Sequence, residues 1–133
     1  MTENELVVYQ TEDVTISAGS ELVEKGVQQF VWGYYFCIEN TSNERIHLLG
    51  KNWNITDEKG NRFCDDSEGF KGEIPELEPG ECFEFSSLAP IASPNAVFYG
   101  SCKIKKDSQL QAENVKIPTF SLSSGQMFSS MIN

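Results

Sequence analysis

The clearest alternation of apolar and polar positions lies in FVWGYYFCIEN, residues 30–40. Every second residue from Phe30 to Ile38 is a large apolar one. A period of two over nine residues, rich in aromatic side chains, predicts a β-strand with one buried face. The following run, NTSN, consists of turn formers and is expected to end the strand.

Shorter alternating stretches predict further strands on both sides of this one. They are expected at about residues 6–10, 14–18, 46–48, 53–55, 62–65, 82–86, 96–106 and 115–122. Residues 20–29, SELVEKGVQQ, are expected to form a loop, and Pro90 and Pro94 to interrupt the chain after residue 86. Gly100 within its strand indicates a bulge or a close backbone approach, and Pro118 indicates an edge position or a bulge.

Turn signals connect these stretches at short intervals. DEKG at 57–60 and Pro79-Gly80 are tight-turn sequences. Seven or more short strands with no helical stretch predict an all-β, antiparallel β-sandwich, of the fibronectin type III or immunoglobulin-like kind without a disulfide. A chain of 133 residues fits one domain, expected at residues 1–122, followed by a flexible tail at 123–133.

The charge narrows the choice of partner. A net charge of −10 repels phosphate backbones and anionic membranes, so neither nucleic acid nor a membrane is expected as a partner. The basic residues Lys103, Lys105 and Lys106 are read as solvated charges at a strand end. With no apolar run of about 20 residues and no secretory signal features, the expected location is cytoplasmic.

Cysteine and histidine give little sign of a chemical centre. The four cysteines are widely spaced, without a C-x-x-C pair, and are expected to be free thiols in a reducing compartment. His47 is the single imidazole, expected on the outward face of a short strand. Cys37 could lie near it, but no third orienting group is marked. No catalytic residue and no cofactor are therefore expected, and the chain is not expected to be an enzyme.

The stretch DSEGFKG, residues 66–72, has part of a phosphate-binding pattern. Gly69 and Gly72 are three apart, but Ser67 stands at the first position of a G-x-G-x-x-G arrangement. No helix follows and carboxylates surround the loop, so a structural loop is favoured over an anion site. The many acids between residues 65 and 81 either attract Mg²⁺ or Co²⁺ weakly or simply keep the loops solvated, and no ligand pattern organises them.

Several motifs in register resemble one family. They are F-x-W-x-Y-x-F-x-I-E-N, HLLGKNWNITDEKG, EGFKGEIPELEPGECFEFSS, FYGSCKI and KIPTFSL, which lie between residues 30 and 122, and the resemblance as a whole covers about residues 6–122. This order is similar to that of the bacterial ApaG family. The resemblance implies a fibronectin type III-like sandwich, a genetic association with cobalt resistance and magnesium efflux, and an unsettled biochemical activity. In eukaryotic relatives, among them an F-box subunit of a ubiquitin ligase, it implies an interaction role.

The residues and the resemblance together predict a non-catalytic binding module. The candidate binding loop comprises Ser67, Glu68, Gly69 and Gly72, and Tyr35 and Tyr99 are candidate interface residues. The expected partner is a protein, with a homodimer through strand edges as a second option and no assigned metal ligands. The alternative is a phosphate-ester or nucleotide-binding protein or hydrolase that uses the Gly69/Gly72 loop and the acidic loops.

Overall fold

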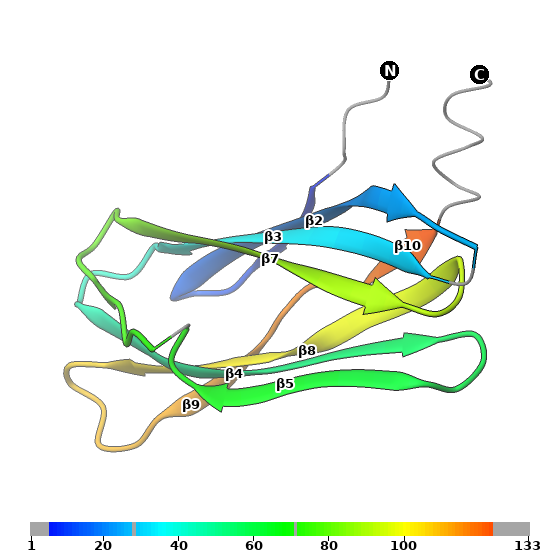
Figure 1. Ribbon diagram of the computed structural model, residues 1–133. Coiled ribbons are helices and arrows are strands. Elements are labelled where there is room, and N and C mark those ends of the chain that lie inside the picture. The colour runs from blue at the N-terminus through cyan, green and yellow to red at the C-terminus, as the bar shows by residue number, and fades with distance from the viewer. Residues whose placement is uncertain (1–5, 28, 71, 124–133) are drawn as a thin grey trace.

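The computed structural model describes residues 6–27, 29–70 and 72–123; the side chains of residues 65–68 and 123 lie outside this description. The described residues form ten strands (Figure 1). In chain order these are β1 (Val7–Gln10), β2 (Val14–Lys25), β3 (Phe30–Asn40), β4 (Ile46–Asp57), β5 (Arg62–Glu68), β6 (Glu76–Leu77), β7 (Cys82–Ile91), β8 (Asn95–Lys106), β9 (Glu113–Lys116) and β10 (Phe120–Ser123). No described residue is helical.

The strands form two antiparallel sheets. Sheet A has the order β1-β2-β3-β7, and sheet B has the order β10-β8-β4-β5, with β6 paired to β4 and β9 paired to β8. Figure 1 shows the two sheets as stacked layers, with β2, β3 and β7 in one and β4, β5 and β8 in the other. The predicted antiparallel β-sandwich is therefore confirmed.

The core lies between the sheets and is rich in aromatic rings. The alternate residues of β3 from Phe30 to Ile38 are buried, as the sequence pattern predicts. Phe36 of sheet A stacks on Trp53 of sheet B with ring centroids 4.4 Å apart, and Phe98 stacks on Phe120 at 5.0 Å. Such ring pairs contribute roughly 0.5–1.5 kcal/mol beyond the area they bury.

The predicted loop at residues 20–29 is wrong. β2 continues to Lys25 and pairs with the first half of β3, leaving only a short turn before Phe30. A bulge between Leu22 and Glu24 shifts the register of this pairing. Because an extra residue reverses which side chains face inward, the alternation in this stretch is broken although the backbone stays extended.

The two short strands predicted around Leu48 and Trp53 form one continuous strand, β4. Its register against β8 shifts between Leu48 and Gly50. The large buried apolar residues are at even-numbered positions before this bulge, Ile46 and Leu48, and at odd-numbered positions after it, Trp53 and Ile55. The change of phase explains why one strand looks like two in the sequence.

Proline acts differently at two places in the fold. Pro90 lies within β7, which runs to Ile91 at the edge of sheet A and is longer than the predicted 82–86. An edge strand tolerates proline because one side needs no hydrogen bond. Pro118 divides the predicted strand at 115–122 into β9 and β10, which pair with successive parts of β8.

Gly100 confirms the expected close backbone approach. Its φ is +151°, and a Cβ there would collide with the backbone carbonyl of Asn52 on β4. The C-terminal tail predicted at 123–133 is not tested, because β10 includes Ser123 and residues 124–133 lie outside the described part of the chain.

Candidate functional site

The glycine loop begins later than the sequence suggests. Ser67 and Glu68 belong to the end of β5, where they pair with Lys51 and Gly50 of β4. The turn itself starts at Gly69, whose N–H donates to the Leu49 carbonyl at 2.8 Å. It closes through reciprocal hydrogen bonds, from the Phe70 N–H to the Glu73 carbonyl at 2.7 Å and from the Glu73 N–H to the Phe70 carbonyl at 3.1 Å.

A buried lysine holds this turn against the core. Lys51 is 6% exposed, and its ammonium donates to the Gly69 carbonyl at 2.9 Å. The ammonium lies 5.0 Å from the ring centroid of Phe70, 5.5 Å from that of Phe85 and 5.7 Å from that of Trp53. These distances are within cation–π range, so the lysine joins the loop to the aromatic core.

The two glycines of the loop have different surroundings. Both have positive φ, +68° at Gly69 and +87° at Gly72. A Cβ on Gly69 would collide with the Glu73 carbonyl, whereas a Cβ on Gly72 would meet no atom within 4 Å. Because the Gly69 and Phe70 amides donate to backbone carbonyls, they do not point out to hold an anion.

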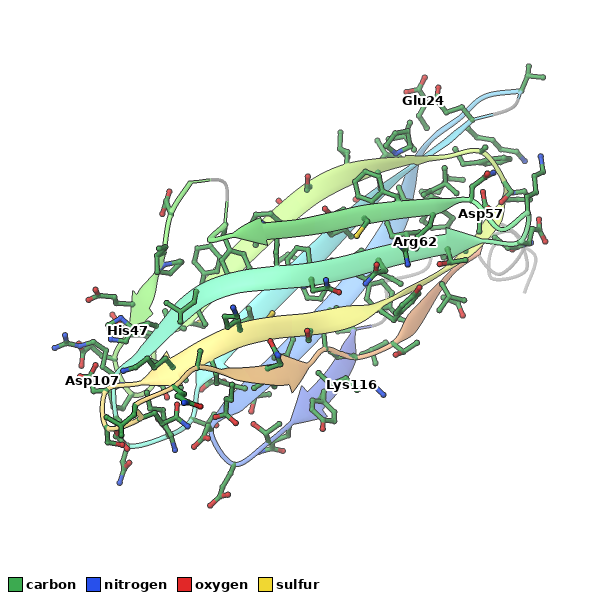
Figure 2. All side chains as sticks on the ribbon, turned by 90° about the horizontal axis from the view of Figure 1, so that it is seen from below. Glu24, His47, Asp57, Arg62, Asp107 and Lys116 are labelled. Atoms are coloured by element: carbon green, nitrogen blue, oxygen red, sulfur yellow. The ribbon has the colours of Figure 1, made fainter. Side chains whose placement is uncertain are left out.

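His47 lies on the outer face of sheet B, in a network of charged side chains. Its Nε2 is 2.8 Å from Oδ1 of Asp107, and its Nδ1 is 3.7 Å from Oε2 of Glu76. Figure 2 shows His47 and Asp107 together at one end of the sheet, opposite the end that carries Asp57 and Arg62. The hydrogen bond from His47, followed by the charge of Arg45, lowers the pKa of Asp107.

The suggested pairing of Cys37 with His47 is wrong. Cys37 occupies an outward position of β3 in sheet A, so the two side chains lie on opposite outer faces of the sandwich. Among the described residues, no group of three or more His, Cys, Asp or Glu side chains is placed to hold a metal ion. All four cysteines are free thiols, as predicted.

The two tyrosines proposed as interface residues also lie on opposite outer faces. Tyr99 faces outward from sheet B, with its hydroxyl 3.1 Å from Oγ1 of Thr56, beside a hollow of about 540 Å³. Tyr35 faces outward from sheet A and lines a larger groove. A single flat contact surface on this protein can therefore include Tyr35 or Tyr99, but not both.

The groove on sheet A has a volume of about 740 Å³ and crosses β2, β3 and β7. Its aliphatic walls are Leu6, Val23 and Leu88, which are 53%, 54% and 57% exposed. Gly33 forms the floor between them, and a Cβ at this position would lie 3.1 Å from Cγ2 of Val23. The missing side chain of Gly33 thus keeps the centre of the groove open.

Carboxylates occupy several outward positions of the same sheet. The outward positions of β2, β3 and β7 carry four glutamates and no lysine or arginine, and β2 ends at the exposed Lys25 next to Glu24. The glutamates are Glu21, Glu24, Glu39 and Glu84. Because these charges share one outer face of the sandwich, they favour a basic partner on that face.

Sequence reasoning found Tyr35 but missed the rest of the groove. Val23 falls in the stretch read as a loop, and Leu88 in the stretch read as interrupted by proline. The sequence does contain one signal of the groove, which is Gly33 among bulky neighbours in the most strongly predicted strand. A glycine inside a strand indicates a close backbone approach or an opening in the surface.

The fold and its surfaces define a class: a two-layered, antiparallel β-sandwich of the fibronectin type III-like kind. The sequence model of the ApaG domain matches residues 20–106. The chain belongs to the ApaG family. Among the described residues, no helix has the length and apolarity needed to cross a bilayer.

Relatives and solved structures agree with this assignment. The chain is 38% identical over 94 residues to the protein ApaG of Allorhizobium ampelinum, covering 71% of this chain and 72% of that protein. It is 38% identical over 96 residues to ApaG of Sinorhizobium fredii, covering 72% and 73%. The crystal structure of a Bordetella pertussis protein described as ApaA has a TM-score of 0.77 and 28% identity, covering 84% of this chain and 93% of that one. A structural genomics target with 21% identity shares the fold, with a TM-score of 0.79 and coverage of 90% and 92%.

Proposed function

We propose that this ApaG-family chain is a non-catalytic recognition module whose groove on sheet A binds a basic, apolar segment of a partner protein. The observation that carries the proposal is the open apolar groove over Gly33, with Glu21 in its lining and three more glutamates on the same outer face. An apolar side chain of the partner enters between Val23 and Leu88, and its lysines or arginines face Glu21 and Glu84.

Like charges oppose the main competing occupant, a second copy of the chain. Two copies meeting through sheet A would bring the same carboxylates together, and each copy has a net charge of −10. A partner with the opposite charge gains attraction from the same residues. We therefore expect association to weaken as salt is added, because screening lengths shorten to about 10 Å at 0.1 M.

A recognition role also fits the surroundings of the other candidate groups. The amides of Gly69 and Phe70 are used within the fold, and the partners of His47 in the described part of the chain are the carboxylates of Asp107 and Glu76, with no serine or cysteine among them. In this proposal the protein acts in the cytoplasm, and the family's association with cobalt resistance and magnesium efflux operates through the bound partner. Equilibrium dialysis with Co²⁺ and Mg²⁺ should then detect no binding tighter than about millimolar.

The experiment is a selection of random peptides displayed on phage against the full chain at low salt. Enriched sequences should place an apolar residue between lysines or arginines. Leu88→Lys should weaken their binding at least about tenfold, since it removes an apolar wall and adds a like charge to the partner's. Val97→Lys is the matched control, because Val97 is also an exposed aliphatic, 41% exposed, but belongs to sheet B.

Three outcomes would contradict the proposal: no enrichment of basic, apolar sequences; equal loss of binding in Leu88→Lys and Val97→Lys; or self-association through sheet A. Sedimentation at low and high salt detects the last of these. Both substitutions change half-exposed surface positions, so their stabilities should stay within about 0.5 kcal/mol of the parent chain.

A further inference from the structure

Two cysteines lie next to each other on the outer face of sheet A, at the end of the groove away from Val31. Cys37 of β3 is opposite Glu84 of β7, and Glu39 of β3 is opposite Cys82. The thiols are therefore diagonal neighbours across one strand pair, and the two carboxylates occupy the other diagonal. Cys37 is half-buried and Cys82 is exposed, so solvent reaches the pair.

The surroundings of Cys37 shift the pKa of its thiol. Burial and then the neighbouring Cys82 raise the pKa of the Cys37 thiol, and Glu84 raises it further. Redox-sensing cysteines have the opposite property, a lowered pKa and a large thiolate fraction. Cys37 therefore lacks the lowered pKa of a redox-sensing cysteine.

The register of β3 against β7 opposes a direct disulfide between Cys37 and Cys82. Diagonal residues of an antiparallel pair are roughly 7–8 Å apart, whereas disulfides need Cα atoms within about 6.8 Å. A single ion bonded to both sulfurs spans more, since metal–sulfur bonds of about 2.3 Å allow sulfurs up to roughly 4.6 Å apart. Diagonal thiols thus suit a bridging ion better than a covalent bond.

We propose that Cys37 and Cys82 form a two-sulfur binding site for a soft monovalent cation of the Cu(I) class. Thiolates select soft ions such as Cu(I), and Glu39 and Glu84 add a negative potential that favours a cation. The carboxylates do not join as ligands, because no three such side chains among the described residues are grouped to hold a metal. A site of two sulfurs matches an ion that accepts two ligands.

Binding is an exchange of protons for the ion. Both thiols must lose their protons to become ligands, so each Cu(I) that binds releases two protons to solvent and forms two Cu–S bonds. The net charge of the chain therefore falls by one for each ion bound. Affinity consequently rises with pH.

The test is a competition between the full chain and the chromophoric chelator bathocuproine disulfonate for Cu(I), under anaerobic conditions. One Cu(I) should bind per chain. Cys37→Ser and Cys82→Ser should each weaken binding at least about tenfold, while Cys64→Ser, a change at the exposed thiol of sheet B, should leave it unchanged. Equal binding by the parent chain, Cys37→Ser and Cys82→Ser would overturn the proposal, as would a loss confined to Cys64→Ser.

A second measurement on the unaltered chain covers the case in which a serine variant fails to fold. Iodoacetamide labelling followed by peptide mass mapping compares the chain with and without Cu(I). Protection of Cys82 with continued labelling of Cys64 supports the site, and continued labelling of Cys82 at one equivalent of Cu(I) contradicts it.

Discussion

Substituting the two glycines of the candidate loop separately measures how tightly the loop is fitted to the core. Gly72→Ala adds a Cβ into open space, so its cost is the penalty for positive φ, roughly 1–2 kcal/mol. Gly69→Ala carries the same penalty and also pushes the Glu73 carbonyl away from the Phe70 amide. Weakening the two reciprocal hydrogen bonds adds about 1–3 kcal/mol.

Gly69→Ala should therefore be less stable than Gly72→Ala by about 1–3 kcal/mol. Urea unfolding followed by tryptophan fluorescence measures the difference, because Trp32 and Trp53 are buried in the folded chain. In thermal unfolding, each kcal/mol corresponds to roughly 3–5 °C for a domain of this length. Gly60→Ala is a further control, since its φ is +88° and no atom lies within 4 Å of the added carbon.

Equal losses in Gly69→Ala and Gly72→Ala, within about 0.5 kcal/mol, would refute this reasoning. The turn would then relax at little cost, and its amides could be released from their backbone partners. A loop of that kind would again be a reasonable anion site. The comparison thus separates a fitted turn from an adaptable cradle.

Three further predictions follow from buried and charged groups. Cys102 should resist iodoacetamide in the native chain at pH 8 while Cys64 is labelled, because burial raises the pKa of Cys102 to about 12; labelling of Cys102 without unfolding would contradict this. His47→Asn should move the acid-unfolding midpoint to higher pH. The folded pKa of Asp107 is lowered by His47, so its contribution is present above the unfolded pKa and lost as pH falls through the folded one; an unchanged midpoint by circular dichroism would argue against it. Trp53→Ala should cost about 3–5 kcal/mol in urea unfolding, since Trp53 contacts Phe36, Phe70 and Phe85; a cost under about 1 kcal/mol would mean that the core closes around the gap.

Much of the fold was predictable because β3 carries an uninterrupted alternation. Its buried face supplies five large residues to the core, and the turns at 57–60 and 79–80 limit the lengths of the neighbouring strands. The errors occur at bulges. One extra residue near Val23 and another near Leu49 reverse the inward phase, so a continuous strand reads as a loop or as two strands.

The candidate site was harder to predict from the sequence than the fold, because it depends on strand register. Leu88 reaches Gly33, and Cys82 reaches Cys37, only because β7 pairs with β3 along its whole length. Lys51 looks like a surface lysine on a strand, yet the bulge at Leu49 turns it inward beneath Gly69. Such neighbours are set by pairing between distant segments, which local patterns do not encode.

The most direct test of the recognition surface is a footprint of the bound peptide. ¹H–¹⁵N spectra of the chain, titrated with a basic, apolar peptide from the phage selection, report which amides change on binding. We predict saturable shifts centred on Val23, Gly33 and Leu88, with none at Val97 or Tyr99. A footprint on the Gly69 turn or on the outer face of sheet B would contradict the account.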